Sequence, residues 1–347
     1  MGLAWFLVFV SCNDLIVGPD PANSPVRNFE LLWRDFDAHY SLFDYKKIDW
    51  DSLYVVNRAL VNHATPNSQL ANVMKNLLRP LNDGHVYLIT EDERFVSNNE
   101  RQSGRPDNFV FENVYTTYFA RNMSTRGDGR YYYGRLQDSI GYLYIPTFED
   151  KDYARIDQWV SELDKVLADL NGVTGLIIDL RNNGGGDAFN SVAVAGRFAD
   201  RRRLFAYGYS RNGRRHNDFS SPYAWYVEPT GKRQFLGAIV VLTNKKTASA
   251  AERFVLSMRV LPHTTVIGDT TEGAFPHSLA RELPNGWSYR VTVGVVVDHN
   301  HLTYEGVGIP PDISIGILST DLSQKRDTIL ETALEYLTHT AINNKSR

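Results

Sequence analysis

From residue 139 to about residue 270, the sequence alternates strand-like apolar runs with segments of helical periodicity. The strand-like runs occupy residues 140–146, 173–180, 204–209, 237–243 and 264–267, and the helical segments occupy residues 153–170, 188–198 and 247–258. Strands separated by helices are typical of parallel sheets, because parallel neighbours need a long crossover connection. The alternation therefore predicts an α/β fold with a substantially parallel sheet.

The segments on either side carry different patterns. Helical spacing at residues 28–44, 49–63 and 67–78 predicts a small helical N-terminal domain at residues 25–90. Residues 91–130 are polar and rich in Gly, Asn and Arg, and we expect residues 91–138 to form an irregular β connection before the main domain at residues 139–345. We also expect strand-like patches at 109–118 and 130–136, a loop around Tyr223, Trp225 and Tyr226, β segments at 278–283 and 287–297, and a helix at 327–339.

Composition and charge exclude several classes of function. With 43% apolar and 22% charged residues among 347 positions, the chain can bury a large core. The net charge of −3 gives no argument for a nucleic-acid partner. The sequence has no His-Glu-x-x-His pair and no phosphate loop ending in Gly-Lys-Ser/Thr, so we expect neither a metal centre nor a cofactor.

The single cysteine, Cys12, ends an apolar run. One cysteine excludes an intramolecular disulfide and a thiolate metal site. Phe9-Val-Ser-Cys12 resembles the end of a bacterial lipoprotein signal peptide, although no Lys or Arg precedes Arg27. The alternatives are a buried N-terminal strand and a misassigned start codon. We expect a signal peptide and linker at residues 1–24, lipid attachment at Cys12, and a location in the bacterial cell envelope, either periplasmic or anchored to a membrane.

Ser249 lies at a predicted strand-to-helix junction. The apolar run at 237–243 ends in a polar turn, and the helical segment that follows has alanine on both sides of Ser249. A hydroxyl at this place lies beside the free N–H groups of a first helical turn, where an anion is favoured. The nucleophile of α/β-hydrolases is positioned in the same way. Helix capping is the ordinary alternative role for this serine.

Three further features could complete an acyl-transfer site, which needs a base, a group that orients the base, and donors for the oxyanion. Arg181-Asn-Asn-Gly184-Gly185-Gly186 follows a buried strand, and consecutive glycines leave backbone N–H groups unshielded. His85 precedes a strand, and Glu305 precedes Gly-Val-Gly. The alternative for the glycine-rich segment is a flexible hairpin loop. The alternative for His85 is a structural or exposed histidine, and the alternative for Glu305 is a plain surface carboxylate.

Four segments in order resemble the C-terminal processing, or tail-specific, serine protease family. They are Ile140-Gly-Tyr-Leu-Tyr-Ile-Pro-Thr-Phe, Gly175-Leu-Ile-Ile-Asp-Leu-Arg-Asn-Asn-Gly-Gly-Gly, Leu242-Thr-Asn-Lys-Lys-Thr-Ala-Ser-Ala-Ala-Glu and Val266-Ile-Gly-Asp-Thr-Thr-Glu-Gly. The resemblance covers residues 139–318 and implies a ClpP/crotonase-like α/β fold. It also implies that Ser249 is the nucleophile and that the Ala250 N–H and a glycine N–H of Gly184 or Gly185 form the oxyanion hole. Residues 91–138 are too short for the PDZ domain of many members.

A comparison of branches within this family implies the base. Members with a catalytic lysine carry it in Thr-Phe-Gly-Lys-Gly, whereas this chain has Thr271-Glu-Gly-Ala274, with alanine at the lysine position. The N-terminal region instead resembles the tricorn-core branch, which takes its base from a histidine there and its orienting glutamate from a segment before Gly-Val-x-Pro-Asp. The resemblance implies these roles for His85 and Glu305. Gly84 stands where the tricorn type has a serine, so no partner is implied for the second ring nitrogen of the histidine.

Taken together, these residues favour a serine endopeptidase that acts on peptides or unfolded proteins. The alternatives are a catalytically silent peptide- or ligand-binding protein on the same fold and an esterase with the same triad. Retention of the nucleophile, base, orienting acid and glycines favours the enzyme. The sequence gives neither the cleavage specificity nor the oligomeric state, and it does not show that His85 and Ser249 meet in space.

Overall fold

The computed structural model describes residues 23–98, 108–150, 156–316 and 319–345. The expected signal peptide, with Cys12, lies outside the described residues. The described chain divides into two compact units. Unit 1 contains the residues up to 98 together with residues 212–218 and 278–293, and unit 2 contains residues 108–211, 219–277 and those from 294 onward.

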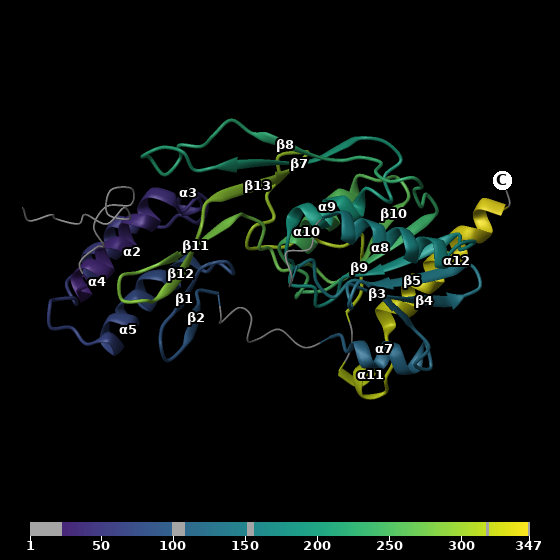
Figure 1. Ribbon diagram of the computed structural model, residues 1–347, viewed down its shortest axis with the longest axis horizontal. Coiled ribbons are helices and arrows are strands. Elements are labelled where there is room, and N and C mark those ends of the chain that lie inside the picture. Colours follow the sequence, from purple (N-terminus) through teal and green to yellow (C-terminus); the bar gives the residue numbers. More distant parts are fainter. Residues whose placement is uncertain (1–22, 99–107, 151–155, 317–318, 346–347) are drawn as a thin grey trace, which may run out of the picture. The chain divides into compact units, whose positions relative to one another are not determined.

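Unit 2 is built around a mixed sheet (Figure 1). Among the described residues its strand order is β14-β10-β9-β6-β5-β4-β3, and the strands from β14 to β5 run parallel. The strands are β3 (Ser124–Arg126), β4 (Tyr131–Gln137), β5 (Ile140–Tyr144), β6 (Gly175–Asp179), β9 (Ala238–Thr243), β10 (Thr264–Gly268) and β14 (Ile313–Ser314). The predicted α/β fold with a substantially parallel sheet is confirmed.

Helices cover both faces of this sheet. Helix α12 (Thr328–Lys345) packs on β6, β9 and β10, and helices α8 (Ile156–Asp169), α9 (Ala188–Ala195) and α10 (Ala250–Arg259) pack together on the opposite face. Successive residues of β6 alternate between the faces, since Leu176 and Ile178 pack with α8–α10 and Ile177 packs with α12. Burial on both faces explains why the strand sequences are unbroken apolar runs.

Two expectations for unit 2 are wrong. The strand-like patch at 109–118 forms helix α7 (Phe111–Thr117), whose buried Val114 belongs to the same core cluster as α12. The expected loop around Trp225 is strand β8 (Tyr223–Val227), in a small sheet of order β13 (Gly294–Asp298), β7 (Arg203–Ser210), β8. In both places packing against distant segments overrides local propensity. A short helix, α11 (Ser319–Ser323), precedes α12.

Unit 1 combines helices with an antiparallel sheet. The helices are α2 (Pro25–His39), α3 (Phe43–Lys46), α4 (Trp50–Arg58), α5 (Asn67–Leu78) and the 3₁₀ helix η1 (Arg79–Leu81). The sheet has the order β11 (Ser278–Glu282), β12 (Ser288–Thr292), β1 (Tyr87–Ile89), β2 (Arg94–Val96). The apolar stripe of α2 is buried at Phe29, Leu32 and Phe36, so it is core as expected.

Two expected elements are divided in the structure. The helix expected at 28–44 consists of α2 and α3, because the chain leaves helical geometry at Tyr40. The β segment expected at 287–297 breaks at Val293, so that β12 belongs to unit 1 and β13 belongs to unit 2. None of the helices within the described ranges combines the length and the apolar character that crossing a membrane requires.

Candidate active site

The loops that follow β6 and β9 are bonded to each other in unit 2. The two strands are parallel neighbours, so their carboxyl ends lie at the same edge of the sheet, where open α/β sheets place their sites. The Ala248 N–H donates to the Asn183 carbonyl at 2.9 Å, and Thr247 Oγ1 donates to the Leu180 carbonyl at 2.9 Å. The glycine-rich loop and the segment that carries Ser249 therefore form one connected structure.

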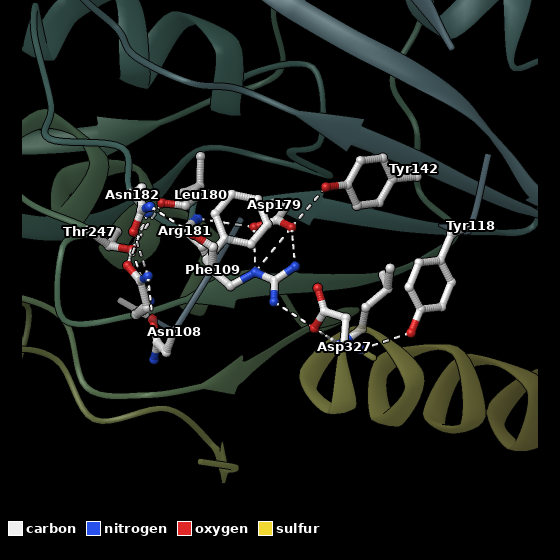
Figure 2. A network of polar contacts seen from close by, with 12 residues as sticks. Asn108, Phe109, Tyr118, Tyr142, Asp179, Leu180, Arg181, Asn182, Thr247 and Asp327 are labelled. Atoms are coloured by element: carbon white, nitrogen blue, oxygen red, sulfur yellow. Dashed lines mark hydrogen bonds and ion pairs between the residues drawn. The ribbon is translucent and has the colours of Figure 1, made fainter. Parts of the chain in front are cut away.

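Arg181 anchors the start of the glycine-rich loop (Figure 2). Its buried side chain binds both carboxylate oxygens of Asp179, with Nε–Oδ1 at 2.9 Å and Nη2–Oδ2 at 2.6 Å. Nη1 donates to Asp327 Oδ1 at 2.7 Å, and the same oxygen accepts the Leu330 N–H at 3.0 Å at the start of α12. The guanidinium carbon lies 4.2 Å from the centre of the Phe109 ring. The end of β6 is thus tied to the N-terminus of α12.

Asparagine side chains hold the next part of the loop, beginning with Asn182 (Figure 2). Asn182 has a left-handed φ of 61°, which asparagine tolerates better than most residues. Its N–H donates to Asn244 Oδ1 at 3.0 Å, and Asn244 Nδ2 donates to Asn182 Oδ1 at 2.8 Å. Asn183 Nδ2 donates to the Ile145 carbonyl at 2.9 Å. Because an amide side chain offers both a donor and an acceptor, these residues fix an irregular backbone that has no ladder bonds.

Ser249 occupies the N-cap of α10 in a strained backbone conformation. Its φ of 56° and ψ of −117° lie outside the regions that residues other than glycine ordinarily adopt. An ordinary N-cap residue is extended, as Ser24 and Asp187 are at the starts of α2 and α9. Strain of this kind is typical of a nucleophile on a sharp strand-to-helix turn. Ser249 is partly exposed and lies at the predicted strand-to-helix junction. Helix capping alone does not require its strained backbone conformation.

Gly185 lies directly against Ser249. A Cβ atom at position 185 would stand 2.7 Å from Ser249 Cβ and 2.9 Å from Ala250 N, and the φ of Gly185 is +105°. No other residue fits so close an approach. The Gly185 N–H donates to Asn183 Oδ1 at 2.9 Å, whereas within the described chain neither the Gly184 N–H nor the Ala250 N–H donates a hydrogen bond. Of the two predicted glycines, Gly184 is therefore the one whose N–H is available to a substrate.

Glu252 is a buried residue of the site that the sequence analysis did not identify. Its Oε2 accepts the Ser249 N–H and the Ala274 N–H, both at 2.9 Å, and its Oε1 accepts Thr271 Oγ1 at 2.6 Å and the Gly273 N–H at 2.7 Å. Burial raises the pKa of Glu252 to about 7, and these hydrogen bonds oppose the rise. The Ser-x-x-Glu spacing at a helix start is a capping-box signature and could have indicated this residue.

Replacing Glu252 by glutamine is expected to destabilise the protein by about 2 kcal/mol, because an amide NH₂ group accepts no hydrogen bond, whereas both oxygens of a carboxyl group, charged or neutral, keep lone pairs that accept the buried donors. The pKa of Glu252 in the folded protein lies above its ordinary value of 4.5, so the neutral form contributes stability that is complete below pH 4.5 and is lost as the pH rises toward 7. The free energy of unfolding of the wild-type protein exceeds that of Glu252→Gln, and this difference should therefore decrease as the pH rises from 4.5 to 7. Urea unfolding across this range measures it, and an advantage that grows with pH would contradict the prediction.

Glu305 lies beside the same segment. Its Oε2 accepts the Phe275 N–H at 3.1 Å, and Phe275 directly follows Ala274, which binds Glu252. The Gly306 N–H donates to the Gly273 carbonyl at 2.8 Å and holds the turn against this segment. Glu305 is only 3% exposed, so its alternative description as a surface carboxylate is wrong. The segment at 271–275 therefore brings Glu305 close to the residues that position Ser249.

His85 belongs to unit 1, where Asp83 fixes its backbone. Asp83 is buried, and its Oδ1 accepts the His85 N–H at 2.8 Å. Its Oδ2 accepts Tyr40 Oη at 3.2 Å and Thr292 Oγ1 at 2.8 Å, and its own N–H donates to Ser97 Oγ at 2.8 Å. The end of α2 and strand β12 thus hold the turn that carries the partly buried histidine. Asp83 was not predictable from the sequence, because an Asp-Gly turn has many ordinary uses.

The predicted site residues therefore fall in both units. Unit 2 brings together Ser249, Ala250, Gly184, Gly185 and Glu305, and unit 1 holds His85. Among the residues that the structure describes, no group of three or more His, Cys, Asp and Glu side chains could hold a metal ion. The chemistry available around Ser249 is that of a hydroxyl beside backbone N–H groups that have no acceptor in the described ranges, with buried carboxylates nearby.

Two known protein families match parts of this chain. A family model described as peptidase family S41 matches residues 139–315, which is about half of the chain. A model of the tricorn protease C1 domain matches residues 21–79.

Individual relatives are similar over part or most of the chain. The C-terminal processing peptidase of Tetradesmus obliquus chloroplasts is 29% identical over 191 residues, which cover 54% of this chain and 38% of that protein. The carboxy-terminal processing protease CtpA of Bacillus subtilis is 25% identical over 182 residues, which cover 52% of this chain and 36% of that protein. The chain thus spans less than half the length of these curated relatives. A crystal structure of a candidate peptidase from Parabacteroides merdae has 35% identity and a TM-score of 0.81, covering 91% of this chain and 97% of that one.

Proposed function

Because this chain belongs to peptidase family S41, we propose that it is a serine endopeptidase that hydrolyses peptide bonds in peptides or unfolded proteins. Ser249 is the nucleophile, His85 is the general base and Glu305 orients that base. The observation that carries the proposal is the geometry of Ser249, a strained N-cap serine against which Gly185 packs. Beside it, the Ala250 N–H donates to no acceptor within the described residues.

In the proposed mechanism, His85 takes the proton of Ser249 Oγ as that oxygen attacks the scissile carbonyl. The carbonyl oxygen becomes an oxyanion, which accepts hydrogen bonds from the Ala250 and Gly184 N–H groups at the positive end of α10. Glu305 stabilises the histidine cation, which then protonates the leaving amine. Water releases the acyl group by the same steps. The role of His85 rests on the sequence resemblance, and burial beside the 271–275 segment supports the role of Glu305.

Covalent labelling with a fluorophosphonate tests this function without knowledge of the natural substrate. The wild-type protein is expected to gain one adduct at Ser249, detected by mass spectrometry of the digested protein, because such reagents phosphonylate activated serines. Ser249→Ala should gain none, and His85→Ala should react far more slowly. Lys246→Ala serves as a matched control and should label at the wild-type rate. Failure of the folded wild-type protein to label would instead favour a catalytically silent binding protein.

We further propose that the protein acts in the bacterial cell envelope with lipid attached at Cys12. This proposal rests on the sequence around Cys12, which lies outside the described residues. Incorporation of labelled palmitate into the wild-type protein and not into Cys12→Ser tests it. Equal incorporation into both proteins would exclude Cys12 as the attachment site.

A further inference from the structure

A buried cation with no carboxylate partner among the described residues lies in the first turn of α10, the helix that Ser249 caps. Arg253 is 3% exposed, and its backbone N–H donates to the Ser249 carbonyl at 3.1 Å. Two other buried arginines of unit 2 have carboxylate partners, since Arg181 pairs with Asp179 and Asp327, and Arg197 pairs with Asp164. Among the described residues, by contrast, no Asp or Glu forms an ion pair with Arg253. A buried charge is ordinarily paired, so this arrangement requires an explanation.

The contacts of Arg253 leave hydrogen-bonding capacity unused. Its Nη2 lies 3.3 Å from the Phe275 carbonyl and 3.5 Å from His277 Nε2, both longer than a strong charge-assisted bond. Its guanidinium carbon stands 4.9 Å from the centre of the Trp225 ring. Arg253 Nη1 and Trp225 Nε1 are both buried and have no acceptor in the described part of the chain. Buried donors are nearly always satisfied in folded proteins, and here two unsatisfied donors belong to side chains that stack on each other.

Aromatic side chains connect these donors to the surface beside the glycine-rich loop. The Trp225 ring lies 5.4 Å from the Phe189 ring and 6.0 Å from the Tyr223 ring, and these two residues are 56% and 36% exposed. Phe189 stands at the start of α9, directly after the glycine-rich loop. The donors and aromatic rings thus belong to α9, α10 and β8, the first two of which begin at the loops that form the site.

We infer that Arg253 and Trp225 form a carboxylate-binding subsite that selects peptide substrates next to Ser249. The inference rests on the proposed peptidase function, because carboxylates are the ordinary anions of a peptide. A guanidinium presents parallel donors that match a carboxylate, and the indole N–H adds a further donor. Burial lowers the pKa of Arg253 to about 10, so the group is still charged at neutral pH. The carboxylate comes either from an Asp or Glu side chain or from the C-terminus of the substrate.

Binding to the Ser249→Ala protein tests the subsite independently of catalysis. The probes are short peptides of neutral sequence that carry a single Glu at different positions. For each position, a matched peptide has Gln in place of Glu. Every peptide is made with a free and with an amidated C-terminus. Titration calorimetry should show roughly 10- to 100-fold tighter binding of the peptides that carry the recognised carboxylate. Discrimination between Glu and Gln identifies a side-chain carboxylate, and discrimination between acid and amide identifies the C-terminus.

Variants of the two donors separate recognition from a structural role. Arg253→Met in the Ser249→Ala background should remove the discrimination, and Trp225→Phe should reduce it while keeping an aromatic ring. Arg259→Met removes the same charge from the end of the same helix and should leave the discrimination intact. The Arg253→Met protein should keep its melting temperature, because it loses an unpaired buried charge. Equal binding of all peptides by the Ser249→Ala protein, or discrimination that survives Arg253→Met, would overturn the inference. If the wild-type protein cleaves no peptide while the Ser249→Ala protein still prefers peptides with the carboxylate, only the peptidase function would be overturned.

Discussion

Replacing Ser249 by alanine is expected to lower kcat/KM for peptide hydrolysis by a factor on the order of 10⁵, while the protein remains folded. The substitution removes only the hydroxyl oxygen that is proposed to attack the substrate, and the Ser249 backbone N–H that binds Glu252 is retained. The measurement is cleavage of an unstructured protein, followed by gel and by mass spectrometry of the products. A comparison of peptide and ester substrates in the same assay separates a peptidase from an esterase.

The proposed base and its proposed orienting group should behave as one unit with Ser249. His85→Ala is expected to cost about as much as Ser249→Ala, and the double variant should be no worse than either single one, because a triad acts non-additively. Glu305→Gln is expected to lower kcat/KM roughly 10³- to 10⁴-fold, since it preserves the shape of the group that is proposed to orient the base. Lys246→Ala is the control and should retain wild-type activity. Normal cleavage by His85→Ala would show that another group is the base.

Replacing Arg181 by methionine is expected to destabilise unit 2 by about 3–5 kcal/mol. The guanidinium lies between the carboxylates of Asp179 and Asp327 and is entirely buried, so its removal leaves uncompensated negative charge in the core. Methionine retains most of the side-chain volume, which limits the cost of a cavity. Urea unfolding measured at neutral pH gives the change in the free energy of unfolding.

A second arginine provides the comparison for this prediction. Arg197 is also buried, but its partner Asp164 is 42% exposed, so Arg197→Met should cost much less because water can solvate the carboxylate that remains. Adding Asp179→Asn and Asp327→Asn to Arg181→Met should recover part of the lost stability, since it removes the unpaired charges. Equal costs for the two arginine variants would show that loss of packing, and not the buried charge, determines the effect.

Local patterns in the sequence were sufficient to predict the main sheet and the place of Ser249. The apolar runs at 173–180 and 237–243 predicted buried strands, and the structure places β6 and β9 there as parallel neighbours. Crossover helices and parallel strands are encoded by residues close together in the chain, so their periodicity can be read directly. The glycine-rich loop and the segment that carries Ser249 follow these strands, and therefore they lie at the same sheet edge.

The residues that support the site were not predictable in this way. Glu252 became identifiable as part of the site only when the segment at 271–274 was seen to wrap around its carboxylate. Asp83 could be recognised as a supporting residue only from its hydrogen bond with Thr292, which lies more than two hundred positions away along the chain. The sequence around an Asp or Glu does not predict which hydrogen-bond donors from distant segments will contact its carboxylate.

The sequence by itself determined the α/β alternation, the strand-to-helix junction at Ser249 and the three-glycine loop, because each depends on backbone preferences of adjacent residues. Tertiary structure alone decided that β1 pairs with β12, that residues 111–117 are helical, and that Arg253 is buried with no carboxylate partner in the described part of the chain. These outcomes depend on which surfaces meet after the chain has folded. Long-range strand pairing and side-chain burial depend on the free energy of the whole core. No short stretch of sequence contributes enough to that free energy to decide the outcome.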